Sequence, residues 1–318
     1  MGGWRRFDGL KSIANRTPGC VAAIGNFDGV HVGHQEVFSA GISRSIEMGL
    51  PCMVITFDIH PASRLRPREA PCVIMTLEDR LRIIAGLGVD EALVIPFDKN
   101  LASRSPEEFA REVLVKGLGA EQVVAGEGWR FGRDRSGDMD LLAELGSEMG
   151  FGVTKVPAYT YGGFPVSSTR IRGALNRGDV GLARNLLGRP HFIRGSVDRG
   201  EGRGLELGYP TVNLECGEVL LPSGGVYAAG FSCEGNIGPA AVNIGRRPTF
   251  GSGPTTFEAH LSGMEGDLYG KEITIFFLAR LRDEHPFPDQ ETLKAQIGRD
   301  VERSKRSFSL SVIQGIPL

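Results

Sequence analysis

Two histidines in a glycine-rich stretch are the first candidates for chemistry in this sequence. The stretch Gly25-Asn-Phe-Asp-Gly-Val-His31-Val-Gly-His34 follows an apolar segment that predicts a buried strand. Its glycines permit a tight turn, and a helix beginning there offers free backbone N–H groups to a phosphate. His31 and His34 are three residues apart and therefore share one face of that helix. We interpret the stretch as a triphosphate site with the histidines as hydrogen-bond donors, rather than as two surface histidines at a helix start.

A second anion site is predicted from hydroxyl and guanidinium groups further along the chain. Ser167, Ser168 and Thr169 open a predicted helix, and Arg172 follows them on it. Hydroxyls and free N–H groups at a helix start, together with an arginine, suit a phosphate. Taken alone, the same residues could be no more than a good helix N-cap.

A glycine-rich loop in the second half precedes a candidate cation site. Gly202, Gly204 and Gly208 lie in a loop that could wrap a nucleotide through backbone N–H groups, although it lacks the Gly-Lys-Ser/Thr ending of a Walker A sequence. Without a further signal, such a loop is more often a surface turn. Thr211 and Asn213 supply that signal, because at alternate positions of a strand their oxygens point to one side, as a hard cation requires.

The elements that must position these residues differ between the two halves. Before about Gly188, short apolar strands alternate with helices, which indicates a parallel sheet with ligands at the carboxyl ends of its strands. We expect strands at 20–25, 53–57, 92–96 and 122–125, and helices at 32–48, at 76–87 and from Ser105-Pro106 onward. Later, glycine-rich turns separate β-rich runs at 192–197, 225–231, 240–244, 255–261 and 272–281. These runs predict a small antiparallel barrel, closed by a terminal helix at 289–304.

Taken together, these motifs resemble those of a known family. The His31/His34 stretch is similar to the HxGH signature of the nucleotidyltransferase superfamily, and the whole chain resembles the bacterial bifunctional riboflavin kinase/FMN adenylyltransferases (FAD synthetases). Other matching segments are 56–61, 75–81, 167–172, 243–250, 257–261 and 267–271. The resemblance implies an α/β chain. Its Rossmann-like nucleotidyltransferase domain would span residues 1–187, and a riboflavin kinase-like β-barrel with a terminal helix would span residues 188–318.

The resemblance also implies two reactions. In the C-terminal domain ATP phosphorylates riboflavin to FMN, with Glu258 as the base that takes the proton of the ribityl 5′-hydroxyl and with Mg²⁺ bound by Thr211 and Asn213. In the N-terminal domain FMN reacts with ATP to give FAD and pyrophosphate, with His31, His34 and Arg172 as catalytic residues. Nucleotide or flavin contacts are implied for Gly25, Asn26, Phe27, Asp28, Gly33, Ser167, Ser168, Thr169, Gly202, Gly204, Gly208, Asn243, Arg282 and Glu284.

One position departs from the family pattern and keeps an alternative open. Gly128 and Trp129 stand where the family usually has Asn or Asp followed by Phe, and glycine has no side chain with which to hold a substrate. The alternative is therefore a riboflavin kinase whose adenylyltransferase domain is impaired. A flavin carrier without turnover is less favoured, because it should lack Glu258, Thr211 and Asn213. A nucleotidyltransferase for a non-flavin substrate leaves the barrel motifs unexplained.

Composition excludes several other classes of protein. The 318 residues are 41% hydrophobic and carry a net charge of −2, which argues against a disordered chain and against a nucleic-acid partner. Five cysteines without a CxxC pair support neither a disulfide framework nor a zinc site. No apolar run is long enough for a membrane helix and no secretory signal is visible. We expect a cytoplasmic enzyme for small-molecule substrates, with the oligomeric state left open.

Overall fold

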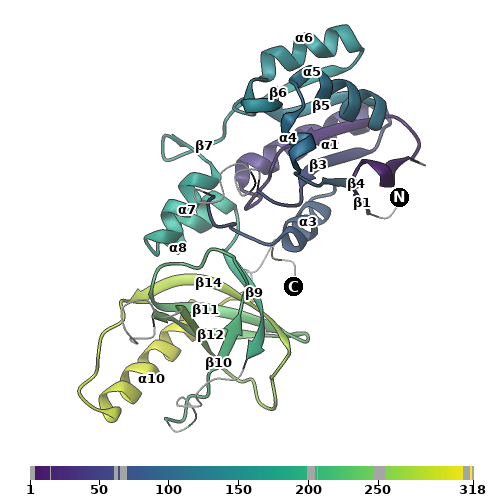
Figure 1. Ribbon diagram of the computed structural model, residues 1–318. Helices are drawn as coiled ribbons and strands as arrows, with labels where there is room; N and C mark the ends of the chain where they lie inside the picture. The colour runs from purple at the N-terminus through teal and green to yellow at the C-terminus, as the bar shows by residue number, and fades with distance from the viewer. Residues whose placement is uncertain are drawn as a thin grey trace. The chain divides into compact units, whose positions relative to one another are not determined.

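The computed structural model describes residues 4–14, 16–60, 64, 70–198, 205, 207–246, 255–310 and 316 (Figure 1). The chain divides into two compact units, the first ending at Ser168 and the second beginning at Thr169. Among the described residues, none of the helices has the length and apolar character needed to cross a membrane.

The first unit is built on the expected parallel sheet. Six strands lie in the order β1-β4-β3-β2-β5-β6, and every neighbouring pair is parallel. The central strands β2, β3 and β4 are buried along their whole length, in keeping with their apolar runs. The strands are β1 (Arg5–Asp8), β2 (Cys20–Ile24), β3 (Cys52–Phe57), β4 (Glu91–Ile95), β5 (Ala120–Gly126) and β6 (Gly152–Val156).

Three helices of this unit, α1, α3 and α5, start where the sequence predicts them, whereas α4 and α6 are not predicted. Helix α1 (Val32–Met48) ends at Gly49, which adopts the left-handed conformation with φ +67°. The Thr76 hydroxyl caps α3 (Leu77–Gly86), and Ser105 and Glu108 form a complete capping box at α5 (Pro106–Phe109). The chain then continues as a π-helix, η3. The remaining elements are η1 (Leu10–Ile13), α4 (Lys99–Ser103), η3 (Ala110–Gly117), η4 (Arg133–Arg135), α6 (Met139–Met149) and the hairpin β7 (Thr160–Tyr161) and β8 (Phe164–Pro165).

The second unit contains the expected antiparallel barrel. Six strands close in the order β10-β13-β12-β11-β14-β9, with antiparallel pairing throughout. Helix α10 (Gln290–Ser307) packs against β11 and β12, and Asp289 caps its start. The strands are β9 (Phe192–Asp198), β10 (Val212–Glu215), β11 (Gly225–Cys233), β12 (Asn236–Arg246), β13 (Thr255–Leu261) and β14 (Glu272–Arg282).

Two short helices before the barrel pack onto it. Helix α7 (Ser168–Asn176) and helix α8 (Val180–Leu187) are joined by a turn at Gly178, and α8 packs against β14. The Leu175 carbonyl accepts a hydrogen bond from Ser223 N at 2.9 Å. A Cβ on Gly178 would lie 2.8 Å from the Tyr227 hydroxyl, so the turn approaches the barrel closely. The contacts thus group these helices with the barrel, whereas the sequence analysis counts them with the first domain.

Candidate functional sites

The HxGH turn, residues 25–34, connects β2 to α1 at the carboxyl edge of the sheet. Phe27, Gly29 and Val30 have positive φ angles of +52°, +86° and +40°. Such angles are strained for Phe and Val, at a cost of roughly 1–3 kcal/mol each, and persist only where the surroundings enforce them. Gly25 is required for a related reason, because a Cβ there would lie 2.8 Å from the Phe27 ring. The turn is therefore a strained loop that must be fixed by its neighbours.

Arg80 on α3 holds the start of this turn in place through hydrogen bonds. Its Nη1 donates hydrogen bonds to Asn26 O at 2.7 Å, Thr56 Oγ1 at 3.0 Å and Phe57 O at 3.3 Å. The side chain is 2% exposed, and its Nε is buried without a hydrogen-bond partner. Burial lowers the pKa of Arg80, while the charges of Asp28 and Asp58 act in the opposite direction. The guanidinium stays protonated, so a buried positive charge lies next to the backbone of the turn at Asn26.

Asp28 and Ser168 fix the middle of the turn. The buried Asp28 carboxylate accepts a hydrogen bond from Ile74 N, at 3.0 Å to one oxygen and 3.1 Å to the other. Ser168 Oγ donates to Asp28 O at 2.8 Å. Asp28 and Ser168, predicted to contact nucleotide or flavin, thus make bonds that shape the turn itself.

The two histidines lie at the start of α1, stacked on each other. His31 is the N-cap residue, and its Nδ1 accepts a hydrogen bond from His34 N at 3.2 Å. The ring centroids are 3.5 Å apart with planes 18° apart, and His31 is 6% exposed. Because Nδ1 accepts, neutral His31 carries its proton on Nε2 and can donate from there. Gly33 leaves room for this ring, since a Cβ would lie 3.3 Å from it.

The other predicted groups of this site are spread over both units. Ser167 lies in the first unit, whereas Thr169 and Arg172 lie on α7 in the second, with Thr169 exposed and Arg172 partly buried. A phosphate role for these residues stays a prediction.

Gly128 follows β5 in an open position. A Cβ there would meet nothing within 4 Å, and the φ angle of Gly128 is not positive. The neighbouring Trp129 stacks on Phe131, with ring centroids 4.7 Å apart and planes 5° apart, and packs against the core. A Cβ at position 128 therefore meets no neighbour, and the backbone there does not require glycine.

The barrel pocket, a cavity of about 360 Å³ in the second unit, brings together six of the predicted residues. Asn213 on β10 pairs with Glu258 on β13, and Glu258 pairs in turn with Asn243 on β12. Directly paired residues share one face of a sheet, so these three side chains form a polar row across three strands. The predicted residues that line the pocket are Thr211, Asn213, Asn243, Glu258, Arg282 and Glu284.

The pocket lining also includes apolar and aromatic side chains, which we call the apolar wall. Val226, Val242, Phe287, Leu293 and Ile297 form this wall, the last two from α10. The lining therefore offers apolar and aromatic side chains to a flat aromatic ligand and a polar row to the polar part of the same ligand.

Glu284, which lines the pocket, lies close to Gly245 on β12. A Cβ on Gly245 would lie 2.5 Å from Glu284 Oε1, so a larger residue there would displace the carboxylate. Glu284 itself is exposed.

The pocket also offers hard oxygen donors for a cation. Thr211 and Asn213 lie two residues apart on its lining, with Glu258 opposite Asn213. Mg²⁺ in enzymes is usually bound by a small number of protein oxygens together with substrate phosphates. The oxygens of Thr211, Asn213 and Glu258 therefore fit this ion. No group of three or more His, Cys, Asp or Glu side chains suited to a metal occurs among the residues that the structure describes.

The glycine-rich loop lies largely outside the described residues. Gly202 and Gly204 belong to the part that is not described. Gly208 has a φ of +80° with open space around its Cα, so its backbone conformation requires glycine.

Two buried charged residues that support these sites are not predicted from the sequence. Arg80 holds the HxGH turn, and Asp300 on α10 pairs with Arg282 at the pocket. Arg80 shares the buried side of α3 with Leu81 and Ile84 but also with Asp79, and Asp300 shares that of α10 with Val301 but also with Ser304. A charged residue beside apolar neighbours is thus only a weak sequence signal, and the tertiary contacts are needed to show the burial.

Comparisons with known proteins give a family match for each of the two units. A model of the FAD synthetase family matches residues 13–170, and a model of the riboflavin kinase family matches residues 187–308. A bifunctional riboflavin kinase/FMN adenylyltransferase of Pseudomonas fluorescens is 39% identical over 93% of this chain and 96% of its own length. The Escherichia coli K12 relative of the same name is 36% identical over 92% of this chain and 94% of its own.

A solved structure shares the fold over nearly the whole chain. This Streptococcus pneumoniae protein, described as a macrolide-efflux protein, superposes with a TM-score of 0.87 at 31% identity. The match covers 96% of this chain and 99% of that one. The efflux activity in that description refers to the Streptococcus pneumoniae protein and is not transferred to this chain.

Proposed function

The chain belongs to the bifunctional riboflavin kinase/FMN adenylyltransferase family, and from that premise we propose how its two sites divide the two reactions. The enzyme phosphorylates riboflavin with ATP to FMN, and it adenylylates FMN with ATP to FAD with release of pyrophosphate. The barrel pocket carries the first reaction and the HxGH turn the second. The observation that carries this assignment is the polar row of Asn213, Glu258 and Asn243 beside an apolar wall in one cavity.

In the barrel pocket, Glu258 is the general base for the kinase reaction. It takes the proton of the ribityl 5′-hydroxyl as that oxygen attacks the γ-phosphorus of ATP, and ADP leaves. The isoalloxazine ring lies against the apolar wall, which orients the ribityl chain toward the polar row. Thr211 and Asn213 would hold Mg²⁺, which when bound neutralises charge on the ATP phosphates.

At the HxGH turn, His31 and His34 bind the phosphates of ATP. The FMN phosphate attacks the α-phosphorus, and the protein aligns two anions and stabilises charge on the departing pyrophosphate. The Nε2–H of His31 is preorganised for this task, because its Nδ1 is occupied by His34 N. The N–H groups at the start of α1 add further phosphate contacts, and Thr169 and Arg172 keep the phosphate role that the family resemblance implies.

The remaining proposals concern domain limits and location. We place the adenylyltransferase domain at residues 1–187 and the kinase domain at 188–318, supported by family matches over 13–170 and 187–308. A cytoplasmic location is proposed because ATP is a substrate of both reactions.

A time course with each flavin separates the two activities. With riboflavin, ATP and Mg²⁺, FMN should accumulate first and FAD should follow, and FMN supplied directly should give FAD with no kinase step. Chromatography of riboflavin, FMN and FAD measures all three. Formation of FMN without any FAD from either flavin would favour the alternative of a kinase with an impaired adenylyltransferase domain.

A further inference from the structure

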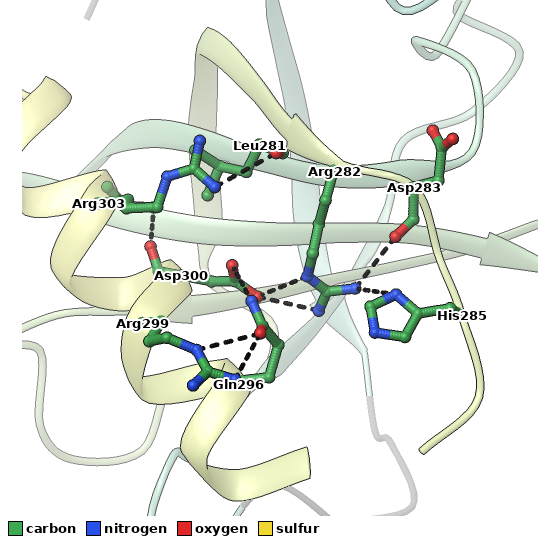
Figure 2. A network of polar contacts seen from close by, with 9 residues as sticks. Leu281, Arg282, Asp283, His285, Gln296, Arg299, Asp300 and Arg303 are labelled. Atoms are coloured by element: carbon green, nitrogen blue, oxygen red, sulfur yellow. Dashed lines mark hydrogen bonds and ion pairs between the residues drawn. The ribbon is translucent and has the colours of Figure 1, made fainter. Parts of the chain in front are cut away.

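A buried ion pair connects helix α10 to the barrel pocket. Asp300 Oδ2 accepts from Arg282 Nε at 2.9 Å and lies 2.9 Å from Arg282 Nη2, and Gln296 Nε2 donates to Asp300 Oδ1 at 2.9 Å (Figure 2). The Asp300 side chain is 3% exposed and that of Arg282 is 19% exposed. Both carboxylate oxygens are therefore used, which is the condition under which a buried charge pair is tolerated.

The same guanidinium holds the segment that follows β14. Arg282 Nη1 donates to Asp283 O at 3.1 Å and lies 3.5 Å from His285 Nδ1 (Figure 2). The centre of the guanidinium lies 5.5 Å from the centroid of the Phe287 ring, within the range of a cation–π contact. The His285 and Phe287 rings are themselves in contact, with centroids 4.4 Å apart. Arg282 thus joins α10 to the backbone and to both rings of residues 283–287.

These residues line the pocket at the end beyond Asn243, because Val226 pairs with Asn243 on one side and with Arg282 on the other. Arg282, His285, Phe287 and Asp300 all line it, next to the apolar side chains of α10. This end suits the isoalloxazine ring, whereas the phosphates and the reacting hydroxyl belong at the polar row of Asn213, Glu258 and Asn243. The conformation of residues 283–287 should therefore affect riboflavin more than ATP.

We infer that Asp300 is a positioning residue for riboflavin: through Arg282 it fixes residues 283–287 as the wall against which the flavin ring binds. The inference rests on the proposed kinase role of the barrel pocket. Arg282, for its part, acts mainly by organising this wall, because its Nε and both of its Nη atoms already contact protein atoms.

The test is the substitution Asp300→Asn, which keeps the shape of the side chain and removes its charge. We expect the KM for riboflavin to rise roughly ten- to hundredfold, the scale of a misplaced binding group, while kcat and the KM for ATP stay within about twofold. Initial rates of FMN formation measure all three. Synthesis of FAD from supplied FMN should be unchanged, because that reaction takes place at the HxGH turn.

Ser304→Ala is the matched control on the same helix. Ser304 is fully buried, and its Oγ donates to the Asp300 backbone carbonyl at 2.9 Å without touching Arg282. It should lower the melting temperature and leave the KM for riboflavin unchanged. An equal loss of kcat in both variants, with an unchanged KM, would show that Asp300 only stabilises the fold and would overturn the inference.

Two further results keep the test decisive. If Asp300→Asn does not fold, Gln296→Leu removes one partner of Asp300 and should raise the KM for riboflavin by a smaller factor; an unchanged KM there would also overturn the inference. Asp300→Glu, which restores the charge, should recover part of the loss.

If the wild-type chain makes no FMN, the proposed function itself fails, whereas FMN formation with a normal KM for riboflavin in Asp300→Asn refutes only the inference.

Discussion

The HxGH turn and the barrel pocket obtain their geometry in different ways. The turn is ten consecutive residues, strained at Phe27 and Val30 and held by Arg80 and by the hydrogen bond from Ile74 N to Asp28. The pocket collects residues far apart in the sequence, and strand register brings them together. The turn should therefore respond to changes in a few buried supports. The pocket should respond to anything that alters barrel closure or the anchoring of α10.

The largest expected effect follows from Glu258→Gln in the pocket. If Glu258 is the general base, FMN formation should fall roughly 10²–10⁴-fold, the usual contribution of such a group. FAD synthesis from supplied FMN should continue at the wild-type rate, because it uses the other site. Chromatography of the two flavin products checks both halves. An active kinase in this variant would remove Glu258 from the mechanism.

How much the sequence predicts also differs between the two regions. The turn could be interpreted directly, because its glycines, histidines and flanking strand are contiguous. The row of Asn213, Glu258 and Asn243 could not be derived from spacing, because it depends on strand register; Glu258 and Asn243 entered only through a family resemblance.

Two of the strands that the sequence missed share a physical reason. Strands β1 and β6 lie at the two edges of the sheet, and their short, partly polar sequences lack the continuous apolar run of a central strand. Arg80 and Asp300 were missed because charged side chains are usually exposed, and only tertiary contacts reveal that these two are buried.

His31→Ser tests whether the turn performs chemistry or only caps a helix. Serine preserves the N-cap of α1 and removes the Nε2–H donor, so FAD formation should fall about 10²–10³-fold with little change in stability. His31→Ala should lose the same activity and additionally about 1 kcal/mol of stability. Rates with supplied FMN and thermal melting separate the two effects. Full activity in His31→Ser would mean that the imidazole serves the helix and not the phosphates.

Acid should weaken the barrel through His191. Burial lowers the pKa of His191 to about 4, from an ordinary value of 6.5, and Nε2 lies 3.1 Å from Leu220 O. Because the unfolded chain binds the proton more readily, stability is lost as the pH falls from 6.5 toward 4, by roughly 3 kcal/mol when complete. His191→Gln keeps an N–H donor without titrating, so its melting temperature should fall less between pH 7 and pH 5. Equal falls would exclude His191 as the cause.

Arg80→Met should damage the turn and spare the pocket. It leaves the acceptors at Asn26, Thr56 and Phe57 without their shared donor, at a cost of roughly 1–3 kcal/mol. FAD synthesis should fall about tenfold as the strained turn relaxes, a factor equivalent to about 1.4 kcal/mol. FMN formation should change less than twofold. Arg82→Met, at a half-exposed position of the same helix, is the control and should leave both rates intact.

The smallest effect is expected at Gly128, where the family resemblance implies Asn or Asp. FAD synthesis should proceed despite this glycine, because the preorganised His31 and the N–H groups of α1 do not depend on it. What is absent is one side-chain hydrogen bond to a substrate, worth roughly 0.5–1.5 kcal/mol. Position 128 is open and has no positive φ, so asparagine can be introduced without strain. Gly128→Asn should accordingly raise kcat/KM for adenylylation about two- to tenfold, and Gly128→Ala, which adds no hydrogen-bonding group, should not. If the wild-type chain makes no FAD and Gly128→Asn restores it, this hydrogen bond decides the activity, and the kinase with an impaired adenylyltransferase domain is the better description.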